Sequence, residues 1–406
     1  MGKTSLLHGS LAVAAAAVLL GACAGAPPDG RGFAGGSSGA GGGGGNGGNG
    51  SSGGGSGSGG ASSGGLFGTS SGGSGTTSAD GGTGPVDVSA PCDTGLAIDD
   101  PNAASFAKAI GICTSAATDG YGLVSATYSN GFGSNAPPAP GQSGLVPKFG
   151  SAMSPREGVR IGVLSSGYAG NYDSMDGLDT GTSAAFVQSG GGPRDGTSYP
   201  TGTAPPGFPK AAQGCPQDGR VNDAIDVKLV LKAPPDATGF QFDFDFYSSE
   251  WPNYVCSNFN DAFVAYLTSA GVTDNISFDS NHNPVAVNID FFDRCTPGAP
   301  VACLRSNGPT PDPPLAVASC SAGPSELDGT GYGETDQTQC NGSNVTATLG
   351  GATGWLVTQA SIQPGEQFTL ELMIWDAGDG LLDSSVLVDH FQWLGGTITT
   401  GTTRVQ

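Results

Sequence analysis

The stretch Phe240-Gln241-Phe242-Asp243-Phe244-Asp245-Phe246-Tyr247 decides the fold. Its phenylalanines occupy every second position, which is the period of a β-strand with one buried face. We expect the phenylalanine face to pack against a second sheet. The opposite face carries two carboxylates, and we expect it to meet water or a cation.

Segments with strand character continue on both sides of this stretch. They are short, and the short links between them favour antiparallel neighbours, so the sequence predicts an all-β protein. The expected architecture is an antiparallel, jelly-roll-like β-sandwich with long loops and a short N-terminal helix. Asp100 is the expected N-cap of that helix, with Pro101 at its first position and Gly111 at its end. The other expected strands are 159–164, 224–231, 262–267, 276–278, 285–288, 355–362, 368–375 and 385–394.

The N-terminus carries the features of a secretory signal. Lys3 supplies positive charge, and the apolar run 11–20 is shorter than the ~20 residues that a membrane span needs. The run ends in Leu20-Gly21-Ala22-Cys23, which resembles the lipobox of bacterial lipoproteins. We therefore expect residues 1–22 to be a signal peptide and Cys23 to be lipidated, with the following Ala24 favouring the outer membrane. An ordinary signal peptide with a chance cysteine is the alternative.

Residues 23–85 form the next expected region, and after the cysteine they are mostly Gly, Ser, Ala, Asn and Thr. This composition buries too little apolar surface to offset the entropy of ordering, so it predicts a disordered tether. A Gly/Ser coil of about 60 residues has a mean reach of roughly 45 Å. Such a tether would hold a folded domain, expected over residues 86–406, clear of a membrane surface.

The charge of the chain restricts its partners. The formal net charge is −21, from 35 acidic and 14 basic residues. Nucleic acid and anionic lipid headgroups both need a basic face, so neither is an expected partner. The expected membrane contact is through the lipid anchor alone. A strongly acidic chain does permit divalent cations.

The cysteines indicate disulfides. Nine are present, and Cys23 is assigned to lipid, which leaves an even number in an exported chain. Eight cysteines allow 105 pairings, and loop closure favours neighbours in the sequence. A zinc site is disfavoured because the chain has no C-x-x-C pair and only three histidines. The expected pairs are Cys92–Cys113, Cys215–Cys256, Cys295–Cys303 and Cys320–Cys340.

Acidic and amide side chains gather in two segments at expected strand ends, 248–263 and 375–389. Carboxylate, amide and backbone carbonyl oxygens are the ligands of a hard cation such as calcium. The spacing is not that of an EF-hand, because the glutamate at position twelve is missing. The candidate calcium ligands are Glu250, Asn260, Asp261, Asp376, Asp379 and Asp383.

Two other interpretations of these residues stay open. Asp and Gly recur in tight turns, because Asp caps the backbone and Gly takes positive φ. A glycoside hydrolase would need two carboxyl groups about 5–10 Å apart in a cleft, and Glu250 with Asp261 or Asp379 could supply them. The glycosidase interpretation fails if these groups lie at opposite ends of the sandwich.

Together these segments resemble the choice-of-anchor L family of bacterial extracellular domains. The resemblance lies in the phenylalanine strand with 249–252, in 260–263 and in the closing acidic segment 375–389. It is strongest with the cysteine-rich versions in myxobacterial lipoproteins, where 109–113 and 275–279 also fit. The resemblance extends over residues 100–393 and implies an anchored surface domain without an established activity.

Other chemistry is scarce. His282 lies in an expected turn and His390 follows Asp389 in an expected strand, so both are expected to be structural rather than parts of a Ser-His-Asp triad. No H-E-x-x-H motif occurs, which excludes zincin chemistry. We expect a non-enzymatic surface module that contacts a glycan or protein, with calcium ordering its loops. A structural envelope protein without ligand is the alternative, and a secreted glycosidase is less favoured.

Overall fold

The structure is a computed structural model of the 406-residue chain. The chain divides into two units, Met1–Ser74 and Gly75–Gln406, and all residues that the structure describes lie in the second. The expected signal peptide, the lipidation site Cys23 and nearly all of the expected tether lie outside the described residues. The described residues are 84–87, 89–170, 193, 199–212, 214–251, 254, 257–287, 291, 326–340 and 343–405, with the backbone alone described for 334–349.

The first sheet is built around the phenylalanine strand, β6 (Gly239–Ser248). Its strand order is β16-β13-β6-β15-β4-β3, and all neighbours are antiparallel. Two short strands join this path, since β1 pairs with β15 and β12 pairs with β6. The other bounds are β1 (Gly84–Pro85), β3 (Ser143–Val146), β4 (Ile161–Ser165), β12 (Gly351–Ala352), β13 (Leu356–Ser361), β15 (Ser384–Gly395) and β16 (Gly401–Arg404).

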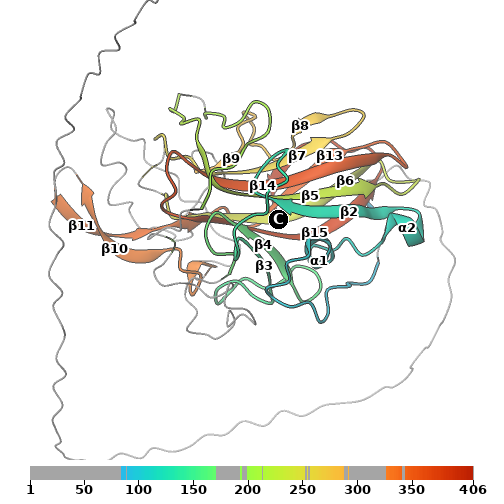
Figure 1. Ribbon diagram of the computed structural model, residues 1–406, viewed down its shortest axis with the longest axis horizontal. Helices are drawn as coiled ribbons and strands as arrows, with labels where there is room; N and C mark the ends of the chain where they lie inside the picture. Colours follow the sequence, from blue (N-terminus) through green and yellow to red (C-terminus); the bar gives the residue numbers. More distant parts are fainter. Residues whose placement is uncertain are drawn as a thin grey trace, which may run out of the picture. The chain divides into compact units, whose positions relative to one another are not determined.

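The second sheet has the order β2-β5-β14-β7-β8, again antiparallel, and β9 also pairs with β7. A separate hairpin consists of β10 (Glu334–Cys340) and β11 (Ser343–Leu349). Figure 1 shows the two sheets stacked face to face. The bounds are β2 (Gly122–Ser129), β5 (Val221–Lys232), β7 (Ala262–Thr268), β8 (Thr273–Asn275), β9 (Val285–Ala286) and β14 (Gln367–Ala377).

The main core lies between the two sheets. All four phenylalanines of β6 are fully buried in it. Phe244 meets Phe263 of β7 with 4.8 Å between ring centroids, and Phe240 stacks on Phe368 of β14 at 5.2 Å. Alternating residues of β5 and β14 complete the layer, among them Leu229. The expected all-β antiparallel sandwich is confirmed.

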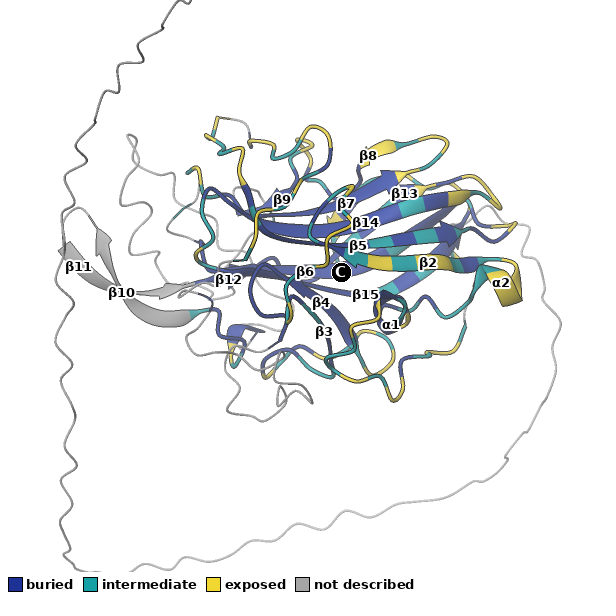
Figure 2. Cartoon of the chain, in the orientation of Figure 1, coloured by how far each residue is buried: buried dark blue, intermediate teal, exposed yellow. Residues whose placement is uncertain are grey.

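The outer face of β6 was expected to meet water or a cation, and the expectation of water is wrong. Asp243 and Asp245 are 2% and 0% exposed. A second core covers this face, formed by side chains such as Phe149, Tyr332 and Leu387. Besides strand residues such as those of β4, it rests on the segments 147–160, 166–170 and 326–333, and Figure 2 shows β6 and β15 buried. With both faces covered, strands such as β4 are buried at every position.

The N-terminal helix begins later than expected. α1 spans Ala103–Ala109, and its N-cap is Asn102, whose side chain accepts from the Ala104 N–H at 3.0 Å. Asp100 instead accepts from the Asn102 N–H at 2.9 Å, so it supports the residue that caps the helix. A second short helix, α2 (Ala116–Asp119), has Ser115 as N-cap and was not expected.

The expected strands of strong alternation are confirmed within a few residues, and weaker segments differ. Residues 276–278 are not a strand; the strand β8 ends at Asn275, and Phe278 forms one isolated bridge to Pro284. Val159 lies outside β4 and is 48% exposed. The turn at His282 is present, and His282 takes a φ of 60°. The sequence did not predict β2, β3, β16 or the β10–β11 hairpin.

One expected disulfide is confirmed. Cys92 and Cys113 are joined, with a Cα–Cα distance of 5.6 Å, and the bond ties the segment before α1 to the one after it. Cys215 is also disulfide-bonded. The other five expected disulfide cysteines lie outside the described residues or, for Cys340, in a strand whose side chains are not described, so their pairing stays a prediction. Among the described residues, no helix has the length and apolar character that crossing a membrane requires.

Candidate functional site

Four of the six candidate residues lie together where strands of both sheets end. Glu250 follows β6 and Asp261 precedes β7. Asp376 is the penultimate residue of β14, and Asp383 precedes β15. All four are at most 1% exposed. We refer to these four side chains as the carboxylate cluster. Antiparallel pairing of the parent strands, which are far apart in sequence, gathers them at one end of the sandwich.

Asp261 connects the two sheets. One carboxylate oxygen accepts the Ala377 N–H of β14 at 3.0 Å, and the other accepts the Ser384 hydroxyl of β15 at 2.5 Å. Burial raises the pKa of Asp261 to about 8, although these two donors and the adjacent Asp376 carboxyl group lower it in part. The carboxyl group is therefore held in place by the fold itself.

Asp376 and Glu250 have the unusual property of buried oxygens without hydrogen bonds. Neither carboxylate oxygen of Asp376 meets hydrogen-bond geometry with any described donor, and the same holds for Oε2 of Glu250. The nearby Ser166 hydroxyl lowers the pKa of Asp376 only in part, and it donates to the Ser384 carbonyl at 3.3 Å. Buried polar atoms are almost always paired, so these orphan oxygens require an explanation.

The charges within the carboxylate cluster oppose one another. Burial first, then the charges of Asp261 and Asp383, raise the pKa of Asp376 well above its ordinary value. Burial and the charges of Asp261 and Asp379 do the same to Glu250. Among the described residues, no Lys, Arg or His forms an ion pair with Asp261, Asp376 or Glu250. An excess of negative charge in a buried volume favours either protons or a metal cation.

The remaining two candidates have turn and packing roles. Asp379 is half-buried, and its carboxylate accepts the Leu381 N–H at 3.2 Å, which is an Asp-capped turn. Asn260 is buried and donates to Gln217 at 3.0 Å. Gly378 shapes the same loop, since its φ is 91° and a Cβ there would lie 2.8 Å from the Phe259 ring.

One member of the site was not predicted. Asp223 in β5 is 1% exposed, and burial together with the charges of Asp383 and Asp379 raises its pKa to about 7. It accepts the Tyr199 N–H with one oxygen, and the other has no partner among the described residues. Its φ of 53° lies in the left-handed region, which Asp adopts more readily than most residues other than Gly. The only sequence feature that marks Asp223 is the Asn222-Asp223 pair before the alternating residues 224–231.

The cluster is not a preformed polydentate metal cage. Among the described residues, no group of three or more His, Cys, Asp or Glu side chains is positioned to hold a metal ion. Calcium, however, accepts backbone carbonyls, hydroxyls and water beside carboxylates, and its coordination is flexible. The glycosidase interpretation receives little support, because Glu250 and Asp261 are buried and line none of the described cavities.

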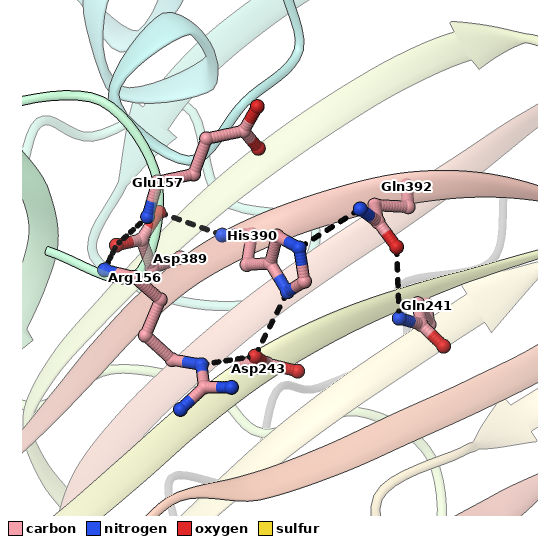
Figure 3. Close-up of polar contacts among 7 residues, drawn as sticks. All are labelled: Arg156, Glu157, Gln241, Asp243, Asp389, His390 and Gln392. Carbon is pink, nitrogen blue, oxygen red and sulfur yellow. Dashed lines mark hydrogen bonds and ion pairs between the residues drawn. The ribbon is translucent and has the colours of Figure 1, made fainter. Parts of the chain in front are cut away.

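A second polar network surrounds His390 on the outer face of the first sheet (Figure 3). His390 Nδ1 lies 3.0 Å from Asp243 Oδ2, and Arg156 Nε lies 2.5 Å from the same oxygen. On the other ring edge, His390 Nε2 lies 2.8 Å from the Gln392 amide. A β-bulge between Asp389 and Gln392 places this polar group on the sheet surface.

Asp389 anchors the same network to the backbone. Its carboxylate accepts the N–H groups of Arg156 at 2.7 Å and His390 at 2.6 Å. Burial raises the pKa of Asp389 to about 7, and the hydrogen bond to Asp243 raises the pKa of His390. The described hydrogen-bond partners of the His390 ring are Asp243 and Gln392.

The network predicts a pH-dependent stability. A raised folded pKa on Asp389 means that the folded protein holds a proton between about pH 4 and 7 that the unfolded chain has released. Its contribution is therefore present at low pH and is lost as the pH rises toward 7. His390 acts in the same direction, since its stabilisation is lost as the pH rises through its raised pKa.

We expect the Asp389→Asn variant, whose amide stays uncharged, to lose less stability than wild type between pH 5 and 7.5. Urea unfolding at several pH values measures this difference. His390→Gln is the matched variant and should change the pH dependence of the unfolding free energy mainly above pH 6.5. Parallel curves for wild type and Asp389→Asn would show that Asp389 does not titrate in this range.

Comparison with known proteins gives one match. Residues 229–391 match the family model described as the Choice-of-anchor L domain. No curated protein and no solved structure matches the chain significantly. The matched range begins in β5, ends in β15 and includes the whole carboxylate cluster. Choice-of-anchor domains are associated with the cell surface and are not an enzyme family, whereas the myxobacterial type of the resemblance stays a prediction. The resemblance over residues 100–228 stays a prediction, whereas the family is confirmed for the rest: the chain carries a choice-of-anchor L domain over residues 229–391.

Proposed function

We propose that this protein is a lipid-anchored, non-enzymatic binding module of the outer membrane, with calcium ordering the strand-end loops of its sandwich. The observation that carries the calcium part is the buried Asp376 carboxylate, whose two oxygens have no hydrogen bond in the described structure. An isolated carboxylate is costly to bury, and a divalent cation offsets that cost.

Calcium would draw the carboxylate cluster together. Asp376 and Glu250 supply free oxygens, and Asp261 is already fixed by hydrogen bonds from both sheets. Carbonyls of the surrounding loops and water would complete the coordination. The cation would then stabilise the end of the sandwich at which loops from both sheets meet, which suits a surface used for adhesion to a glycan or protein.

The test is thermal unfolding of the full chain, carrying Cys23→Ser to prevent lipidation, in millimolar calcium and in excess chelator. A ligand at 100 times its dissociation constant adds ~2.7 kcal/mol of stability, which for a domain of this size is a rise of about 5 °C. Asp376→Asn should abolish the rise and should itself be neutral or stabilising in chelator, because it replaces a carboxyl group whose charged form is disfavoured by burial with an uncharged amide of similar volume.

Asp274→Asn is the control, since Asp274 is exposed in β8 and is not a member of the carboxylate cluster. It should keep the full calcium response. Superimposable curves for wild type in calcium and chelator would sink the calcium part and leave a structural envelope protein without ligand as the better reading. Membrane fractionation of cells expressing wild type or Cys23→Ser tests the anchor separately.

A further inference from the structure

The outer edge of β2 is open. β2 is the last strand of the second sheet, and β5 is its strand partner. Among the described residues, hydrogen bonds close the two ends of this edge, where the Leu123 N–H donates to Thr114 at 2.9 Å and the Asn130 N–H donates to Ala136 at 3.0 Å. Between those points an edge strand presents backbone groups that a further strand can use.

The register shows which backbone groups face outward. In an antiparallel pair, successive residues direct their N–H and C=O alternately toward and away from the partner. The Asn130 N–H points away from β5, and the pairing of 125–129 with β5 is regular, so Ala126 and Tyr128 also point away. Among the described residues, the outward N–H and C=O of these two form no hydrogen bond.

A groove runs beside this edge. Its volume is about 890 Å³, and Ala126, Thr127 and Tyr128 form one wall. The facing walls are the segment 97–103 and the loop 137–141. Figure 2 shows β2 as a strand with exposed and half-buried positions, unlike the buried strands β6 and β15.

The facing loop offers few N–H donors to the strand edge. Pro137, Pro138 and Pro140 have no N–H, and the Ala139 N–H already donates to the Gln142 side chain at 2.8 Å. The prolines instead supply a rigid apolar wall against which alternate side chains of an added strand could pack. The groove therefore has the two parts of a strand-addition site, which are backbone groups for affinity and a wall for side chains.

The charge of the groove selects the partner. Asp99 and Asp100 lie in its lining, no Lys, Arg or His does, and the whole chain carries a net charge of −21. The Gly-rich segment 24–83 of this chain fits poorly, because Gly is a poor strand former and Arg31 is its only basic residue. A second copy of β2 would bring its own proline loop into the same space.

We propose that the groove beside β2 binds an extended, lysine- or arginine-bearing peptide segment of a partner protein, which adds as a strand to the outer edge of β2. This inference rests on the proposed binding role and names the partner class for it. It does not depend on calcium, because the groove and the carboxylate cluster share no residues. The edge between its closed ends accommodates about five or six residues of added strand, at ~3.3 Å each.

The test uses a fluorescein-labelled Lys-Val-Lys-Val-Lys-Val peptide and the full chain with Cys23→Ser, measured by fluorescence anisotropy at low salt in calcium and in chelator. Two further peptides carry N-methyl groups, one on all lysines and one on all valines. Strand addition uses the N–H groups of one alternate set only, so one methylated peptide should lose at least tenfold in affinity and the other should bind like the parent. A Glu-Val peptide should not bind.

Two variants test the protein side. Ala126→Pro removes one outward N–H without taking a bond from the β5 ladder and should weaken the parent peptide about tenfold. Asp100→Asn should weaken it less and reduce its salt dependence. Hydrogen exchange of residues 122–130 should slow when the peptide binds.

The proposal is overturned if the parent peptide does not bind at millimolar concentration, or if both methylated peptides bind equally. Equal affinities of the two methylated peptides would mean that the peptide contacts the protein through its side chains alone, as it would on a nonspecific or saccharide-binding surface. Because the methylation result concerns the peptide, it stands even if Ala126→Pro fails to fold. Peptide binding without any calcium-induced thermal shift would leave this inference intact while removing the calcium part of the proposed function.

Discussion

Replacement of Asp261 by alanine should lower the free energy of unfolding by about 2–4 kcal/mol in calcium-free buffer. The side chain is fully buried and accepts from Ala377 at 3.0 Å and from Ser384 at 2.5 Å. Alanine leaves both donors buried and unpaired, and each such donor costs about 1–3 kcal/mol. Because Ser384 begins a strand of the first sheet and Ala377 ends one of the second, the loss should also loosen the contact between sheets.

Equilibrium urea unfolding in chelator measures this effect without any contribution from a cation. Asp261→Asn is the control, since its amide oxygen can keep one of the two hydrogen bonds at nearly the same volume, so it should cost about half as much. A loss below ~0.5 kcal/mol for the alanine variant would mean that the strand ends are held together by other contacts. Asp376→Asn is expected to leave the unfolding free energy in chelator unchanged or higher. The difference between the two variants distinguishes a carboxylate that stabilises the fold from one that binds a ligand.

Much of the fold could be predicted because its central strands obey a simple period. β6, β14 and β15 alternate or run continuously apolar, and each was expected within about two residues of its bounds. β2 was missed because it lies at a sheet edge with exposed positions and a register shift between Leu123 and Ser125, which together erase the pattern. β16 was missed because its four residues contain no apolar side chain.

The burial of the outer face could not be predicted from β6 itself. Two aspartates on one face indicate water when the strand is considered alone. The loop segments that help to cover them, 147–160, 166–170 and 326–333, have no periodicity, because their apolar residues are inserted singly. Asp245 instead accepts from the Tyr247 hydroxyl at 3.2 Å and the Thr353 hydroxyl at 3.2 Å, which is how a buried carboxyl is tolerated.

The candidate site was predictable in its members and not in its geometry. Glu250, Asp261 and Asp376 were singled out because acidic residues at strand ends converge when the strands pair. Sequence gave no sign that Asp376 would be without hydrogen bonds while Asp261 would have two, since that difference depends on which loop N–H groups reach each side chain. Asp223 required knowledge of a left-handed backbone conformation inside β5.

The phenylalanine face of β6 should carry the largest share of stability of any single strand. Phe244 is fully buried, and its ring centroid lies 4.8 Å from that of Phe263 in the other sheet and 6.0 Å from that of Phe242. Its strand neighbours Leu356 and Val388 are fully buried as well, so nothing can relax into the space that a smaller side chain leaves. Phe244→Ala should therefore cost about 3–5 kcal/mol.

Urea unfolding followed by tryptophan fluorescence measures this loss, because Trp393 lies in the same core. Val124→Ala is the control, since Val124 is 45% exposed and should change stability by less than ~0.5 kcal/mol. A loss below about 1 kcal/mol for Phe244→Ala would contradict close packing of the two sheets. A loss of unfolding free energy above that value for Phe244→Ala would mean that the inner core helps to fix the strand ends that hold the carboxylate cluster. The covered outer face would then not do so alone.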